Sequence, residues 1–138
     1  MGYRAPRLYA VPVAHAYSSM NDSTSYYYGH TGMGASTTVG NHFIKIPRTG
    51  IIRGASVIIY CTVGSNEDVS VYALNSTTSG ESLIGTVNMD VTPVWAVNDN
   101  LNIPININDN IGIRVLTPAW AVNPTGISGK GYILIETS

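Results

Sequence analysis

The chain contains 138 residues, of which 44% are hydrophobic and only 11% are charged, and its formal net charge is -1. This length fits one compact domain that can bury a core without disulfides or metals. Seven Lys and Arg against eight Asp and Glu leave no excess of positive charge, which excludes a typical binder of nucleic acid or of anionic membranes. No apolar run approaches the roughly 20 residues that span a bilayer. The N-terminal residues lack the pattern of a secretory signal, so we expect no export by that route.

The first 38 residues differ in texture from the rest and are predicted to form an extended N-terminal arm. Pro and Gly interrupt them, and a polar tract over residues 18–25 precedes three consecutive tyrosines, Tyr26, Tyr27 and Tyr28. No apolar period runs through this segment, and Tyr supplies a large contact area at a small entropic cost. We therefore expect the arm to become ordered on another surface. A strand over residues 8–14 fits only at a sheet edge or between subunits, because Pro12 lacks an amide hydrogen.

From residue 39 onward, alternating apolar residues are separated by Gly, Asn, Asp and Ser, which predicts a series of short strands. Residues 56–63 are apolar on both faces, as in a central strand. The clearest period of two joins Ile103, Ile105 and Ile107. No window has the apolar spacing of a helix.

About seven or eight short strands joined by turns predict an all-β fold, an antiparallel β-sandwich of jelly-roll topology. An immunoglobulin-like sandwich is the alternative, although the paired Cys and central Trp of its antibody-type version are absent. The predicted organisation is an arm over residues 1–38, for attachment or inter-subunit contact, followed by a β-sandwich domain over residues 39–138.

Two nearly identical heptapeptides, TPVWAVN at residues 92–98 and TPAWAVN at residues 117–123, each follow a predicted strand. In one interpretation, Thr-Pro ends the strand and the Trp covers one end of the sandwich, which we slightly favour. In the other, Trp95 and Trp120 lie at a subunit contact, where Trp is enriched. Trp95, Trp120 and the three tyrosines of the arm are therefore the candidate assembly contacts.

Groups that could carry chemistry are few and scattered. His15, His30 and His42 lack the close spacing of metal ligands, and Cys61 alternates with apolar residues as a structural thiol does. The Gly-rich segment 29–34 lacks the strand, helix and Gly-Lys-Ser/Thr ending of a phosphate-binding loop. The two Asn-Asp-Asn triplets lack the spaced ligands of a calcium loop and suit turns. We therefore predict no enzyme activity, no catalytic or metal-binding residues and no cofactor.

Several strand-and-turn segments of residues 39–138 are distinctive: IPRTGIIRG (46–54), NEDVSVY (66–72), IPININDNIGIRV (103–115), TPAWAVNP (117–124) and GYILIE (131–136). These segments resemble small virion proteins of tailed bacteriophages. In such proteins a single jelly roll, often trimeric, decorates the capsid, forms a head fibre or ends a tail fibre. The resemblance does not cover the first 38 residues and implies no enzyme activity.

The function expected from this resemblance is that of a structural virion protein, a capsid decoration or head-fibre subunit. It would form a homo-oligomer, with a trimer expected, and dock on the major capsid protein or another virion protein at the surface of the phage particle, after synthesis in the host cytoplasm. The alternative is a tail-fibre or receptor-binding adhesin, in which Trp95, Trp120 and nearby Asn residues recognise a host-surface glycan. A nucleic-acid or membrane partner is not expected.

Overall fold

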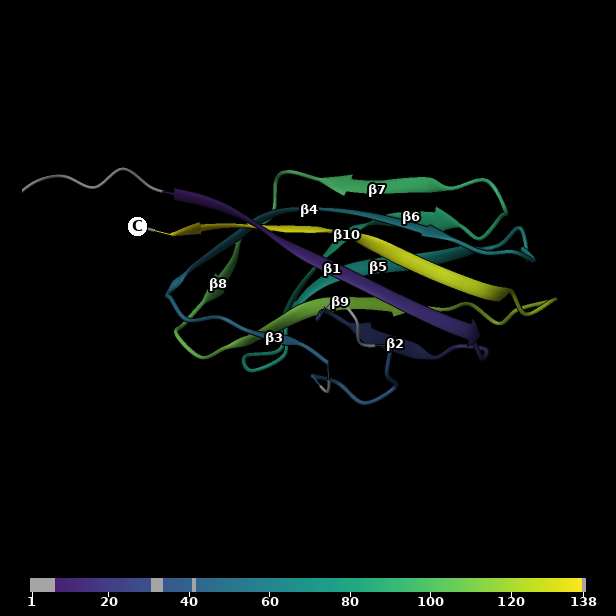
Figure 1. Ribbon diagram of the computed structural model, residues 1–138, viewed down its shortest axis with the longest axis horizontal. Helices are drawn as coiled ribbons and strands as arrows, with labels where there is room; N and C mark the ends of the chain where they lie inside the picture. Colours follow the sequence, from purple (N-terminus) through teal and green to yellow (C-terminus); the bar gives the residue numbers. More distant parts are fainter. Residues whose placement is uncertain (1–6, 31–33, 41, 138) are drawn as a thin grey trace, which may run out of the picture.

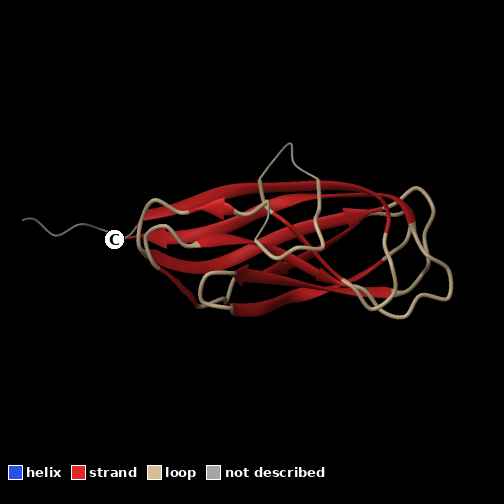
Figure 2. Ribbon diagram, turned by 90° about the horizontal axis from the view of Figure 1, so that it is seen from below, coloured by secondary structure: helices blue, strands red, loops and turns tan. Residues whose placement is uncertain are grey.

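The computed structural model describes residues 7–30, 34–40 and 42–137, which form two antiparallel sheets packed face to face and contain no helix (Figure 1). The strands are β1 (Arg7–Ser19), β2 (Ser25–Tyr28), β3 (Ile44–Lys45), β4 (Gly50–Tyr60), β5 (Asp68–Asn75), β6 (Gly80–Asn88), β7 (Val94–Asn98), β8 (Ile103–Ile105), β9 (Asn110–Leu116) and β10 (Thr125–Thr137). Sheet A has the order β1-β10-β4-β7, with β8 also paired to β4, and sheet B has the order β2-β9-β5-β6, with β3 also paired to β9. Strands run along the long axis of the molecule, and most loops gather at its two ends (Figure 2).

The pairing of the strands is nested. β1 pairs with β10, β2 with β9, β4 with β7 and β5 with β6. Each pair therefore encloses the next one in the sequence, and the β5–β6 hairpin is the innermost. Successive nested pairs alternate between sheet A and sheet B, which is the arrangement of one long hairpin rolled up around a core. This is the jelly roll that the sequence predicts. In the immunoglobulin-like alternative the first and last strands belong to different sheets, whereas here they are neighbours.

The core lies between the sheets and is made mostly of β-branched side chains. Ile103 and Ile105 are 3% and 1% exposed, as their period of two predicts. Ile107 is 60% exposed, because β8 ends at Ile105 and the chain then turns. That turn is held by the Asp109 carboxylate, which accepts the Asn106 N–H at 2.9 Å. The alternation in the sequence therefore continues beyond the strand itself.

The predicted arm is wrong for residues 7–28, which form two strands inside the sandwich. β1 pairs with β10 along almost its whole length, and β2 pairs with β9 and contributes Tyr26 and Tyr28 to the core. The sequence concealed this because the inward-facing side of β1 has few buried residues, of which His15 is polar. The expectation that a strand here would need an edge position is confirmed, since β1 is the edge strand of sheet A. Residues 1–6 and 31–33 of the predicted arm lie outside the described residues.

Candidate assembly surface

The outer face of sheet A carries apolar side chains that no described segment covers. Strand pairing defines two rows across four strands, Ala14–Lys130–Ile58–Trp95 and Pro12–Tyr132–Ser56–Val97. Exposure is 47% for Trp95, 52% for Tyr132, 64% for Val97 and 62% for Leu8, which lies further along β1. We call the outward-facing apolar residues of this sheet the apolar outer face: Leu8, Ala10, Pro12, Ala14, Ile58, Trp95, Val97, Tyr132 and Leu134, of which Ile58 is only 9% exposed.

The size of this face is that of an interaction site. Three steps between strands give about 14 Å, and six residues of β1 give about 20 Å, so its projected area is about 300 Å². Contiguous apolar patches of a few hundred Å² on soluble proteins frequently mark binding surfaces. A standard interface buries about 800 Å² per partner. The apolar outer face is therefore large enough for the centre of an interface, with a more polar rim around it.

The apolar outer face contains two hollows, and Tyr132 lines both of them. One hollow, of about 430 Å³, is lined by Trp95, Lys130, Pro12 and Ala14 among others, and the other, of about 280 Å³, lies over Gly54 and Ser56. The hollows exist because small residues of β1 and β4 lie beside large aromatic ones. A partner with matching relief could fill them.

Charge is almost absent from the middle of this face. Lys130 lies within one of the two rows. At one end of the face, Arg53 and Glu136 neutralise each other, with Arg53 Nε donating to Glu136 Oε2 at 2.6 Å. Covering the face therefore removes little charge from water, which avoids the cost of burying an unpaired charge in an interface.

The outer face of sheet B has a different character. Its central row is Tyr27–Arg114–Tyr72–Leu83. Arg114 donates to both carboxylate oxygens of Glu81, at 2.9 and 2.8 Å, and lies over the Tyr72 ring, 4.2 Å from its centroid. These contacts satisfy the guanidinium within the chain. Sheet B thus presents a charged and internally paired surface, and sheet A presents an apolar one.

The five predicted assembly contacts separate into exposed and buried residues. Trp95 lies on the apolar outer face, and Tyr27 is half-buried on the outer face of sheet B. Tyr26, Tyr28 and Trp120 are 1%, 0% and 7% exposed, so their prediction as surface contacts is wrong. The reason for the tyrosines is alternation, because β2 directs residues 26 and 28 into the core and residue 27 outward.

The two heptapeptides have different fates although their sequences are nearly the same. Residues 94–98 form β7, whose pairing with β4 directs Trp95 outward. Residues 117–123 form a loop instead, and Trp120 is buried there, with its backbone N–H donating to Asp22 Oδ1 at 3.3 Å. The second copy thus agrees with the interpretation in which Trp covers the core. Sequence reasoning missed Tyr132 and Val97, and the signal that could have found them was the presence of apolar residues on both faces of neighbouring strands.

Side chains that could bind a metal or act as nucleophiles do not form a cluster among the described residues. Among residues 7–30, 34–40 and 42–137, no group of three or more His, Cys, Asp or Glu lies close enough to hold a metal. Cys61 is buried, its Sγ donates to the Asp90 carbonyl at 3.1 Å, and burial together with the Asp90 charge raises the pKa of its thiol. A raised pKa disfavours the reactive thiolate. In the described part of the chain, no helix is long and apolar enough to cross a membrane.

No protein-family model and no curated protein matches the chain. Among solved structures it is similar to a chain in the structure of the infectious bursal disease virus Gx strain, with a TM-score of 0.54 and 14% identity over 96% of this chain. The match covers 32% of that chain, so this protein spans about a third of its length. A chain of Desmodium yellow mottle tymovirus aligns over 100% of this chain and 90% of its own length, with 12% identity and a TM-score of 0.40 that adds no argument. The first likeness establishes the fold, the double-sheet jelly roll that occurs in viral capsids.

Proposed function

We propose that this chain is a structural subunit of a virus particle, a capsid decoration or head-fibre protein of a tailed bacteriophage. It assembles with copies of itself as a homotrimer and docks on the major capsid protein or another virion protein at the particle surface, after synthesis in the host cytoplasm. The observation that carries the proposal is the apolar outer face of sheet A, because an isolated jelly roll has no reason to expose Trp95, Val97 and Tyr132 together.

The low charge of the whole chain supports the same role. Only 11% of the residues are charged, and the two ion pairs of the described residues, Arg53–Glu136 and Arg114–Glu81, use four of them. Uncharged polar and apolar surface can be buried against a partner without leaving charges unpaired. The role requires no catalytic group, so we propose no enzyme activity.

The fold supports the proposal only at a general level. Double-sheet jelly rolls serve in viral capsids and also in lectins, and fold alone does not determine function. The apolar outer face therefore has to be tested in assembly. Light scattering should give a mass three times 14.7 kDa, and the protein should co-sediment with purified phage capsids. A strict monomer that also fails to bind capsids would contradict the proposal.

A second candidate function rests on the hollow of about 430 Å³ between Trp95 and Tyr132. Two exposed aromatic rings beside Lys130 can stack on a sugar and donate a hydrogen bond, as in an adhesin that recognises host-surface glycans. Trp120 is buried and takes no part. Binding on a glycan array that is lost in Trp95→Ala, together with a monomeric mass, would favour this function over assembly. Absence of any glycan signal would argue against it.

A further inference from the structure

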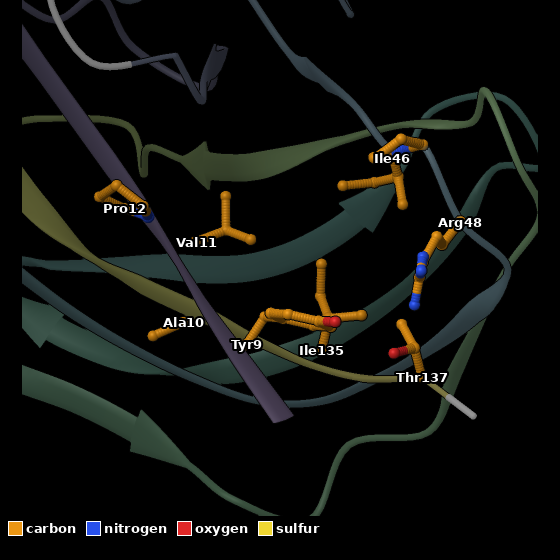
Figure 3. Close-up of a pocket in the computed structure, with 9 residues that line it drawn as sticks. Tyr9, Ala10, Val11, Pro12, Ile46, Arg48, Ile135 and Thr137 are labelled. Atoms are coloured by element: carbon orange, nitrogen blue, oxygen red, sulfur yellow. The ribbon is translucent and has the colours of Figure 1, made fainter. Parts of the chain in front are cut away.

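A groove of about 500 Å³ opens between β1 and the segment that joins β3 to β4. Figure 3 shows Val11 of β1 and Ile135 of β10 directed toward Ile46 of the joining segment, with Arg48 and Thr137 at one end. The volume lies within the range of about 300–1,000 Å³ typical of small-molecule sites. Its walls are apolar and its polar groups are gathered at one end.

The joining segment forms a fixed wall. The Ile46 N–H donates to the Asp109 carbonyl at 2.9 Å, and the Ile46 carbonyl accepts the Asn108 N–H at 2.7 Å. These bonds attach the segment to the turn before β9 rather than to the edge of β1. The groove between them is therefore present before any ligand arrives, and a preformed site avoids much of the entropic cost of binding.

Arg48 lies at the polar end of the groove, and Arg7 lies beside Tyr9, which also lines it. The ion pairs of the described residues involve Arg53 and Arg114, so neither Arg7 nor Arg48 is neutralised within residues 7–30, 34–40 and 42–137. The nearby Thr137 hydroxyl has the largest effect in lowering the pKa of the Tyr9 phenol, and both arginines lie close enough to lower it further. An apolar groove thus ends at a local excess of positive charge in a chain that carries very little charge elsewhere.

We infer that this groove binds a single-chain amphiphile with a carboxylate head, such as a medium-chain fatty acid. The acyl chain lies along Val11, Ile46 and Ile135. The carboxylate meets Arg48, whose guanidinium can donate two parallel hydrogen bonds to it, and the Tyr9 hydroxyl lies beside it. This inference goes beyond the assembly role and does not depend on it, because the groove shares only Ala10 and Pro12 of β1 with the apolar outer face and its other lining residues lie outside that face.

The test is calorimetric titration of the full chain with dodecanoate below its micelle concentration, with dodecanol and acetate as matched ligands. Dodecanoate should bind at one site per chain, whereas acetate and dodecanol should bind at least about tenfold more weakly, since each lacks one half of the recognition. Shortening the chain from dodecanoate to decanoate should weaken binding by about fourfold per methylene removed. Dodecyl phosphate distinguishes a general anion site, which would bind both heads equally, from a carboxylate site.

Two variants locate the site. Arg48→Gln removes the charge at the groove and should weaken dodecanoate binding by about tenfold or more. Lys130→Gln removes the charge beside the Trp95 hollow and should leave the affinity for dodecanoate unchanged. Trp95 fluorescence should also be unchanged, because Trp95 lies on the outer face of sheet A and does not line the groove. The inference is overturned if dodecanoate does not bind, or if dodecanol or dodecyl phosphate binds with equal affinity. It is also overturned if Arg48→Gln binds dodecanoate as tightly as the wild type. Loss of dodecanoate binding in Lys130→Gln would overturn it as well, because it would assign the ligand to the outer face.

Discussion

His15 of β1 and Tyr28 of β2 pack against each other between the two sheets, with ring centroids 4.1 Å apart and planes tilted by 48°. Both are buried, and neither the His15 ring nitrogens nor the Tyr28 hydroxyl has a hydrogen-bond partner among the described residues. Burial lowers the pKa of His15 to about 4 and raises the pKa of Tyr28. The pair joins the first two strands of the jelly roll at a point where a positive charge cannot be accommodated.

This pair predicts a loss of stability in mild acid. The unfolded chain binds a proton at His15 near pH 6.5, whereas the folded chain does so only near pH 4, so the unfolded state takes up more protons between these values. The free energy of unfolding should therefore fall as the pH decreases from 6.5 to 4, by about 3 kcal/mol from this residue. Urea denaturation across this range measures the change.

The matched control for the acid effect is His15→Leu, which keeps a similar volume and removes the titrating group. The difference in unfolding free energy between wild type and this variant should depend on pH between 6.5 and 4 and be constant above pH 7.5. A difference that does not change with pH would show that His15 is not the cause.

Gly131 of β10 pairs with Val57 of β4, and its replacement should be costly. A Cβ at this position would overlap the Ser56 carbonyl oxygen and approach Val57 Cα within 2.9 Å. Since backbone atoms of a central strand cannot move aside, Gly131→Ala should destabilise the fold by about 2 kcal/mol or more. Gly85→Ala is the control, because its Cβ would meet Ala96 Cβ at an ordinary 3.4 Å. Thermal unfolding of both variants decides, and equal melting temperatures would contradict the prediction.

Val97 should be important for assembly but not for folding. It is 64% exposed on the edge strand β7 of the apolar outer face, so Val97→Lys should change the free energy of unfolding by no more than about 0.5 kcal/mol. The introduced charge should weaken association of the copies by at least about tenfold, because an interface core must exclude water. Leu83→Lys, at a 45% exposed position of sheet B, should leave the mass unchanged. Light scattering over a dilution series compares them, and dissociation by both variants would remove the assignment to sheet A.

Asn75 holds together the turns at one end of the sandwich. Its side chain is fully buried, and its amide nitrogen donates to Asp109 Oδ2 at 2.8 Å and to the Pro104 carbonyl at 3.1 Å. Asn75→Ala removes both of these buried bonds, so that Asp109 Oδ2 keeps only the Asn106 N–H among the described residues, and should cost about 2–3 kcal/mol. Asn88→Ala, which removes an exposed bond to Asp68, should cost less than about 1 kcal/mol. Urea denaturation of the two variants measures the loss of unfolding free energy in each. Equal losses would contradict the prediction that the buried hydrogen bonds of Asn75 contribute more to stability than the exposed bond of Asn88.

Much of the fold follows from the local alternation of apolar and polar residues. The sequence-based predictions were wrong mainly where this alternation is weak or where a strand is apolar on both faces. Residues 111–115 could be assigned to a strand because side chains of a strand alternate whatever its neighbours are. The turn expected at residues 108–110 is one residue too long, since β9 begins at Asn110. β1 could not be separated from an arm, since its inner face is defined by few residues and by pairing with β10, which is more than 100 residues away. Long-range pairing leaves little trace in a single sequence.

The candidate assembly surface could be predicted only in part. Trp95 was a candidate from its residue type, but the same reasoning applied to Trp120, which is buried. The two heptapeptides differ at a single residue, so their opposite fates come from their surroundings, a strand paired to β4 in one case and a loop over the core in the other.

The sequence by itself determined that this protein is an all-β sandwich with a surface poor in charge, because composition and a period of two depend only on which residues are present and on the geometry of one strand. Tertiary structure alone decided which side of each doubly apolar strand faces outward. It also gathered Leu8, Trp95, Val97 and Tyr132 on one face and placed Arg48 at the end of a groove. Those positions depend on strands that are distant in the chain and adjacent in space, and only the packed fold brings them together.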